Sequence, residues 1–182
     1  MTYAATPALI CLNLQRNYLD PSSPQFVPRA AHALVHAQSC LGWARRRELP
    51  ILHVHTLHGG ASTPGSKPIS GCEPLSTEAL VFKRSRSFFD SVEFAKGVGR
   101  ARYGDAFVLG FTGIRDCVAA AVDARRSGWR LVFVRDAIAS EGLPPHDPTV
   151  VDAVLSAVLC ELSGCANAAD LIGRDVPASM IE

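Results

Sequence analysis

Residues 106–139 read AFVLGFTGIRDCVAAAVDARRSGWRLVFVRDAIA and contain a strand, a helix and a second strand in succession. The apolar run at 106–110 predicts the first strand, and a loop separates it from a helix expected over 116–126. Gly128 marks the end of that helix, since glycine commonly adopts the left-handed conformation there. The apolar run at 130–135 predicts the next strand. A strand, a helix and a strand in this order form a parallel βαβ unit.

The same alternation extends over the rest of the chain. Further strands are expected at 8–14, 51–56 and 80–82, and further helices at 28–48, 91–98 and 147–162. The tail at 166–172 is expected to add an edge strand. This pattern predicts a single α/β domain over residues 1–182, built as a three-layer, Rossmann-like parallel sheet with helices on both faces. The sequence has no glycine-rich motif of the kind that binds nucleotide phosphates.

Composition and charge exclude several classes of partner. Hydrophobic residues make up 48% of the chain, which fits a sheet buried on both faces. No apolar run approaches the roughly 18 residues of a membrane span, and the first residues lack the positive region of a secretion signal. The net charge is +1, and no recognition motif accompanies the basic residues at 45–47. We therefore expect a cytoplasmic protein that binds neither membranes nor nucleic acid.

The six cysteines do not form an evident disulfide or metal framework. The chain is too long for a small disulfide-stapled scaffold. Cys11, Cys40 and Cys160 lie in apolar stretches, as buried reduced thiols do. Cys160 and Cys165 are not spaced like a metal-binding pair. We expect reduced thiols, of which one is chemically special.

Polar residues follow the predicted strands at the places where ligands bind in parallel sheets, namely the carboxyl ends. Asn13 and Gln15 end the first strand, Lys83 ends the third, and Cys117 opens the helix expected at 116–126. A helix N-terminus and a nearby lysine both favour the thiolate form of a cysteine. The free N–H groups of a first helical turn can also bind an oxyanion. These positions predict an active site with Cys117 as its reactive group.

Three segments resemble, in order, the cysteine hydrolase (isochorismatase-like hydrolase) family. ALICLNLQRNYLD at 8–20 is similar to the opening strand of the family. VFKRSRSFFDSVEF at 81–94 is similar to the stretch that carries the family lysine. The segment at 110–140 resembles the nucleophile region, with Cys117-Val118, Gly128 and Asp136-Ala137 in the family positions.

The resemblance implies a cofactor-independent hydrolase that cleaves an amide, carbamoyl or related C–N bond of a small molecule. Cys117 would form a thioester with the substrate, and Lys83 would support the thiolate. A cis peptide is expected near Thr112-Gly113 to aim backbone N–H groups at the oxyanion. A homodimer or tetramer is expected as well. The residues implied to contact substrate or oxyanion are Gln15, Thr112, Gly113 and Arg115.

The chain departs from the family pattern at Asn13, where the family carries an aspartate that shuttles protons. An amide cannot accept and return a proton as a carboxylate does. Three alternatives follow. The protein is a silent relative that binds a ligand or regulates; or it uses another base, Asp20 or Glu73; or Lys83 and the helix dipole alone activate Cys117.

Two further features bear on function. His53, His55 and His58 are of a type that binds metals, but the family's nicotinamidases carry an Asp-x-His where this chain has Thr56-Leu57-His58. We therefore predict no metal site. The stretch at 59–77 is rich in glycine, proline and serine and is expected to be a functional loop. A flavodoxin-like module outside the family, acting through protein contacts, is the remaining alternative.

Overall fold

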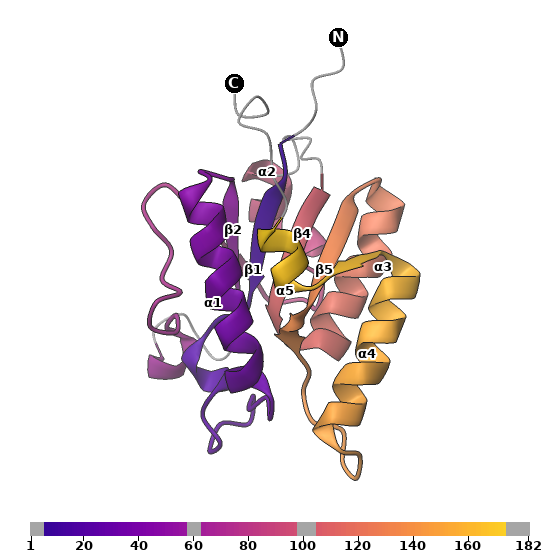
Figure 1. The fold of residues 1–182 in the computed structure, drawn as a ribbon. Helices are drawn as coiled ribbons and strands as arrows, with labels where there is room; N and C mark the ends of the chain where they lie inside the picture. Colours follow the sequence, from indigo (N-terminus) through magenta and orange to yellow (C-terminus); the bar gives the residue numbers. More distant parts are fainter. Residues whose placement is uncertain (1–5, 58–62, 98–104, 174–182) are drawn as a thin grey trace.

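Six parallel strands form the central sheet of the computed structural model, which describes residues 6–57, 63–97 and 105–173 (Figure 1). The strand order is β3-β2-β1-β4-β5-β6, and every neighbouring pair is parallel. This arrangement confirms the predicted α/β fold class. The strands are β1 (Ala8–Leu12), β2 (Ile51–Thr56), β3 (Ala79–Lys83), β4 (Asp105–Phe111), β5 (Arg130–Ala139) and β6 (Gly164–Ala166).

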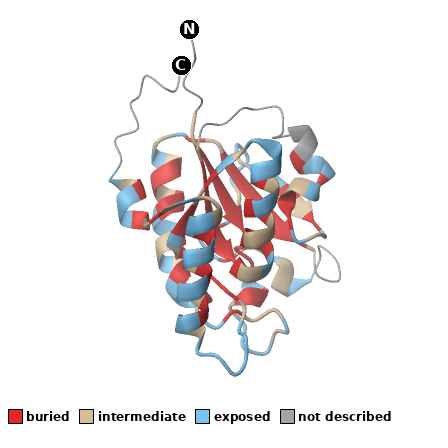
Figure 2. Ribbon diagram, turned by 90° about the vertical axis from the view of Figure 1, so that its right-hand side faces the viewer, coloured by how far each residue is buried: buried red, intermediate tan, exposed pale blue. Residues whose placement is uncertain are grey.

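Helices cover both faces of this sheet. The helix α1 packs with α5 on one face, and the helices α2, α3 and α4 lie on the other. Figure 2 shows the buried strands between these outer layers. The helices are α1 (Ala30–Arg46), α2 (Val92–Gly97), α3 (Val118–Ser127), α4 (Pro148–Leu162) and α5 (Ala168–Ile172). A π-helical turn, Gly113–Cys117, lies between β4 and α3.

Local sequence signals set the helix ends. Gly128 ends α3 in the left-handed conformation, at φ 72°. Asp147 caps α4 by accepting a hydrogen bond from the N–H of Thr149, and Pro148 occupies the first helical position. All five residues of β1 are buried, as expected for a central strand covered on both faces.

The C-terminal part of the described chain differs from the prediction. The residues expected to form an edge strand at 166–172 are mostly helical, and the edge strand β6 ends at Ala166, the first of them. Asn167 begins α5 through a capping box with Asp170, a local signal that outweighs the apolar character of the segment.

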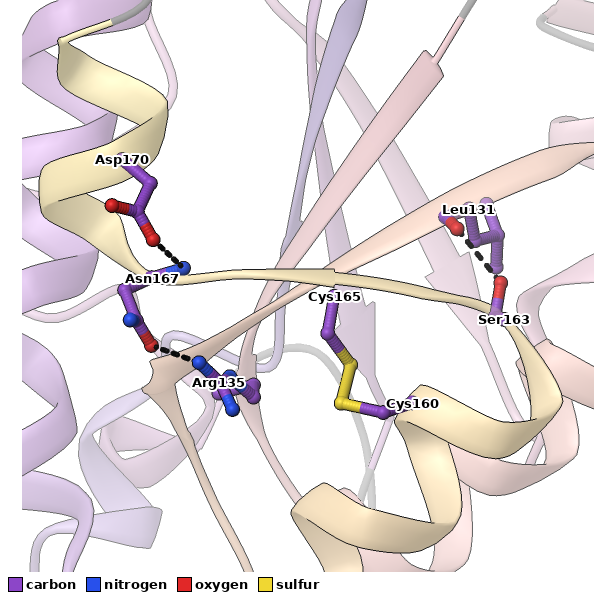
Figure 3. The surroundings of a disulfide bond; sticks show 7 residues. All are labelled: Leu131, Arg135, Cys160, Ser163, Cys165, Asn167 and Asp170. Atoms are coloured by element: carbon purple, nitrogen blue, oxygen red, sulfur yellow. Dashed lines mark hydrogen bonds between the residues drawn. A yellow bond between two sulfur atoms is a disulfide. The ribbon is translucent and has the colours of Figure 1, made fainter.

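A disulfide joins Cys160 at the end of α4 to Cys165 in β6 (Figure 3), with the two Cα atoms 5.2 Å apart. The expectation of a reduced Cys160 is therefore wrong. Cys160 is exposed because it lies on the outer side of α4, and the chain reversal after Leu162 brings Cys165 beside it. The free cysteines, all of them buried, are Cys11, Cys40, Cys72 and Cys117.

The strand order fixes where a ligand site can form. From β1 the chain proceeds outward to β2 and β3, then returns to place β4 on the other side of β1. Ligands in open α/β sheets bind where the strand order reverses in this way. Among the described residues, no helix is long and apolar enough to span a bilayer.

Candidate active site

A buried ion pair lies at the switch point between β1 and β4. Lys83 Nζ donates to Asp116 Oδ2 at 2.7 Å, and Asn13 Nδ2 donates to the same oxygen at 2.7 Å. The exposed fraction of the side chain is 1% for Lys83 and 9% for Asp116. Three segments far apart in the sequence thus meet around one carboxylate oxygen. We call Asn13, Lys83, Thr112 and Asp116 the strand-end cluster.

Asn13 is held from every side. Its backbone has a φ of 55°, in the left-handed region that asparagine tolerates better than most residues, and its N–H donates to the Val54 carbonyl at 2.8 Å. The side-chain Oδ1 accepts from Thr56 Oγ1 at 2.7 Å, and Nδ2 also donates to Thr112 Oγ1 at 2.7 Å. The amide nitrogen and the amide oxygen therefore both have hydrogen-bond partners inside the protein.

Thr112 directs the π-helical turn toward the strand-end cluster. Its φ is 64°, a strained conformation for a β-branched residue and one that concentrates at functional sites. Its hydroxyl lies 2.6 Å from the Phe111 carbonyl oxygen and 2.7 Å from Asp116 Oδ2, so it shares its hydrogen between them, and the Asp116 N–H donates to the Thr112 carbonyl at 2.8 Å. The expected cis peptide at Thr112-Gly113 is wrong. Among the described residues the cis bond is Pro144-Pro145, and left-handed backbone at Thr112 turns the loop instead.

Lys83 reaches the cluster from two strands away. It is the last residue of β3 and lies in register with Thr56, the last residue of β2. Its ammonium also donates to the Ser85 carbonyl at 3.0 Å, which fixes the side chain from the outer side. A long side chain at this register position can cross the end of β2 and meet Asp116.

Cys117 lies beneath the strand-end cluster, on the apolar side. It is fully buried and belongs to the core cluster that includes Ile10, Leu12 and Phe88. Burial raises the pKa of the Cys117 thiol well above its ordinary value, the Asp116 carboxylate raises it further, and Lys83 acts in the opposite direction with a smaller effect. The expectation that this pKa is lowered is therefore wrong, because desolvation outweighs the lysine.

Gln15 and Gly113 have packing contacts that occupy them. The Gln15 amide bonds the backbone N–H and carbonyl of Thr56 and the Ser66 carbonyl, so it ties β2 to the loop after it. A Cβ at Gly113 would lie 2.2 Å from Leu155 Cδ2, so the absent side chain lets α4 approach the turn.

The backbone donors around Arg115 have partners within the protein, and oxyanion binding by this turn stays a prediction. Arg115 is half-exposed and forms an ion pair with Glu141. The N–H groups of Ile114 and Arg115 donate to Ser140 Oγ and Glu141 Oε1, both at 3.3 Å. Together with the Asp116 N–H, three donors of this turn are thus satisfied within the protein.

The carboxylate of the cluster is one that sequence reasoning missed. The alternative base Asp20 is exposed and binds Ser22, and Glu73 accepts from the Gly71 N–H; both lie outside the strand-end cluster. Asp116 directly follows the loop that the strand-end rule had selected. Applying that rule to every titratable residue near the loop would have found it.

The histidines of β2 are placed away from the strand-end cluster. His53 Nε2 lies 2.7 Å from Glu78 Oε2, and burial lowers the pKa of His55 to about 4. His58 lies outside the described residues. Within the described ranges, no group of three or more metal-ligating side chains occurs.

A hollow of about 610 Å³ opens beside the loop that follows β1. Arg16 and Asn17 line it together with residues of the predicted functional loop, including Thr63 and Gly65. Asn17 Oδ1 is buried and has no hydrogen-bond partner among the residues that the structure describes. This hollow is large enough for a small ligand.

Comparison with known proteins now identifies the family. The isochorismatase domain matches residues 7–157. The chain belongs to the isochorismatase family.

Relatives of this isochorismatase-family protein include hydrolases of amide bonds. It is 25% identical to maleamate amidohydrolase of Pseudomonas putida, over 82% of this chain and 80% of the relative. A putative isochorismatase hydrolase from Oleispira antarctica superposes with a TM-score of 0.85 at 20% identity, over 96% of this chain and all of the other. N-carbamoylsarcosine amidase from Thermoplasma acidophilum superposes with a TM-score of 0.71 at 18% identity, over 90% and 96% of the chains. The protein is therefore a hydrolase of this family.

Proposed function

We propose that this protein hydrolyses an amide or carbamoyl-type C–N bond of a small molecule at the strand-end cluster. The observation that carries the proposal is the buried Lys83–Asp116 ion pair at the switch point of the sheet, with Asn13 bonded to the same carboxylate oxygen. Removing two charges from water costs desolvation free energy, so a buried ion pair is a poor way to stabilise a fold. Active sites, by contrast, commonly contain such pairs.

The names of two relatives support the bond type. Maleamate amidohydrolase and N-carbamoylsarcosine amidase are both named for the cleavage of C–N bonds in small acids. Hydrolysis needs water and an acid–base group, so the proposed reaction requires no cofactor.

The second candidate is a ligand-binding or regulatory protein on the same fold. Two observations favour it: an amide occupies position 13, and Cys117 is buried with a raised pKa. The cytoplasmic location stays a prediction, and the thioester route through Cys117 that the resemblance implies competes with direct attack by water on the same bond. Disulfides such as Cys160–Cys165 are more common in oxidising compartments than in the cytoplasm, which weighs against the predicted location.

A substrate panel separates the two candidates. We expect ammonia or amine release from at least one of maleamate, N-carbamoylsarcosine and related monoamides of small dicarboxylic acids, and its loss in Lys83→Ala. The control is Lys67→Ala, which removes a lysine outside the cluster. Thermal stabilisation by a panel compound without any product would instead establish the binding protein.

A further inference from the structure

The hydrogen bonds of the Asp116 carboxylate are strongly uneven. Oδ2 accepts from Asn13 Nδ2 and Lys83 Nζ, each at 2.7 Å, and lies 2.7 Å from Thr112 Oγ1, which shares its single hydrogen between this oxygen and the Phe111 carbonyl. No described residue donates a hydrogen bond to Oδ1. The fully buried polar atoms without a partner do not include Oδ1, so this oxygen is not fully buried. The side chain keeps 9% of its surface exposed. Of the two carboxylate oxygens, Oδ1 is thus the one that no described residue occupies, and it can accept a hydrogen bond from water.

Only one of two adjacent residues can face the strand ends. Successive helical residues point about 100° apart, since a turn contains 3.6 residues in an α-helix and more in a π-turn. The π-helical turn directs Asp116 to Lys83 and Cys117 into the apolar core. A thiol that is fully buried among apolar side chains is a poor nucleophile because the thiolate is the reactive form.

We propose that Asp116 is the general base of this hydrolase and that water, not the Cys117 thiol, attacks the substrate. This inference rests on the proposed C–N hydrolysis. Oδ1 accepts a proton from water as the water oxygen bonds to the carbonyl carbon. The C–N bond then breaks, and the proton passes from Asp116 to the leaving nitrogen. The products are a carboxylic acid and an amine, and the carboxylate is regenerated.

The other members of the cluster orient this base. The Lys83 ammonium and the Asn13 amide hold Oδ2, which leaves Oδ1 as the atom that exchanges the proton. An aspartate at position 13 would face Asp116 with no hydrogen to donate. A carboxylate at position 116 thus requires a hydrogen-bond donor at position 13, and Asn13 supplies it. The departure from the family pattern at position 13 accompanies the base proposed at position 116.

Three variants test the assignment on the substrate found in the panel. Asp116→Asn keeps the shape of the side chain and is expected to lower kcat by about 10²–10⁴-fold, the usual contribution of general acid–base catalysis. Cys117→Ala is expected to keep kcat within about three-fold of the wild type. Asp123→Asn removes a carboxylate from the surface of α3 and serves as the charge-matched control. Urea unfolding of each variant separates loss of activity from loss of fold.

Isotope labelling distinguishes a base from a nucleophile. After many turnovers in H₂¹⁸O, the peptide containing Asp116 is expected to carry no ¹⁸O, because the label enters the product directly. Label in that peptide would overturn the general-base role, as would an active Asp116→Asn protein combined with an inactive Cys117→Ala protein. Either result leaves the proposed function standing. A wild-type protein that turns over no panel compound overturns the proposed function, and the base assignment with it.

Discussion

At the scale of single residues, the amide of Asn13 has a donor on the side where Asp116 needs one. Nδ2 donates to Asp116 Oδ2 and Thr112 Oγ1, and Oδ1 accepts from Thr56 Oγ1. A carboxylate at position 13 keeps the last of these bonds and loses the other two. The residue that differs from the family pattern is therefore adapted to its present neighbours.

We expect Asn13→Asp to destabilise the protein by about 1.5–3 kcal/mol at pH 7, because a hydrogen bond to a charged group is replaced by a contact between two carboxylates. The exchange variant Asn13→Asp/Asp116→Asn restores one donor and one carboxylate and should recover most of that loss. Urea unfolding of the wild type, both single variants and the double variant measures the coupling free energy. Additive losses in the double variant would show that the two residues do not interact as described.

At the scale of elements, the approach of β1 to β4 depends on Gly110. Its φ is 126°, and a Cβ there would lie 1.8 Å from the Leu12 carbonyl oxygen. β1 leads into Asn13, and β4 leads into the π-helical turn. The close approach at Gly110 holds these two strands side by side. A side chain at this position must push apart the strands on either side of the switch point.

Gly110→Ala is expected to cost more than about 3 kcal/mol, because backbone strain at positive φ adds to a clash with a neighbouring strand. Gly128→Ala is the matched control. That glycine also has a positive φ, 72°, but nothing lies within 4 Å of its missing Cβ, so a loss of about 1–2 kcal/mol is expected. Chemical denaturation of both variants gives the comparison, and equal losses would contradict the role assigned to the close approach.

At the scale of the whole molecule, α4 exposes an apolar stripe to solvent. Val150, Val154 and Val158 follow at helical spacing with exposed fractions of 56%, 59% and 40%. They line a groove of about 520 Å³ together with Leu143. Apolar patches of this kind commonly mark protein contacts, which supports the predicted self-association.

We expect a homodimer or larger assembly in solution, in which this stripe packs against a second copy. Val154→Glu should then shift the population toward monomer, because burying an unpaired charge is costly. Light scattering coupled to size-exclusion chromatography measures the mass. Val35→Glu changes an equally exposed valine on α1 and should leave the assembly intact. A wild-type protein that elutes as a monomer at all concentrations would refute the prediction.

The sequence determined the fold class and most element positions, because apolar runs, proline, glycine and capping residues act within a few residues of where they stand. Strand ends also indicated the candidate site, since Asn13 and Lys83 terminate apolar runs. The strand-end rule and the family resemblance both selected Cys117, the residue directly after Asp116.

Tertiary structure alone decided which of these residues meet. Left-handed backbone at Thr112 and the π-helical turn rotate Asp116 to Lys83 and turn Cys117 into the core, a choice between neighbours that no sequence period encodes. The Cys160–Cys165 disulfide likewise depends on where α4 reverses into β6. The first outcome rests on packing between segments distant in the chain and the second on the pairing of β6 with β5, and such packing fixes side-chain direction more finely than local preference does.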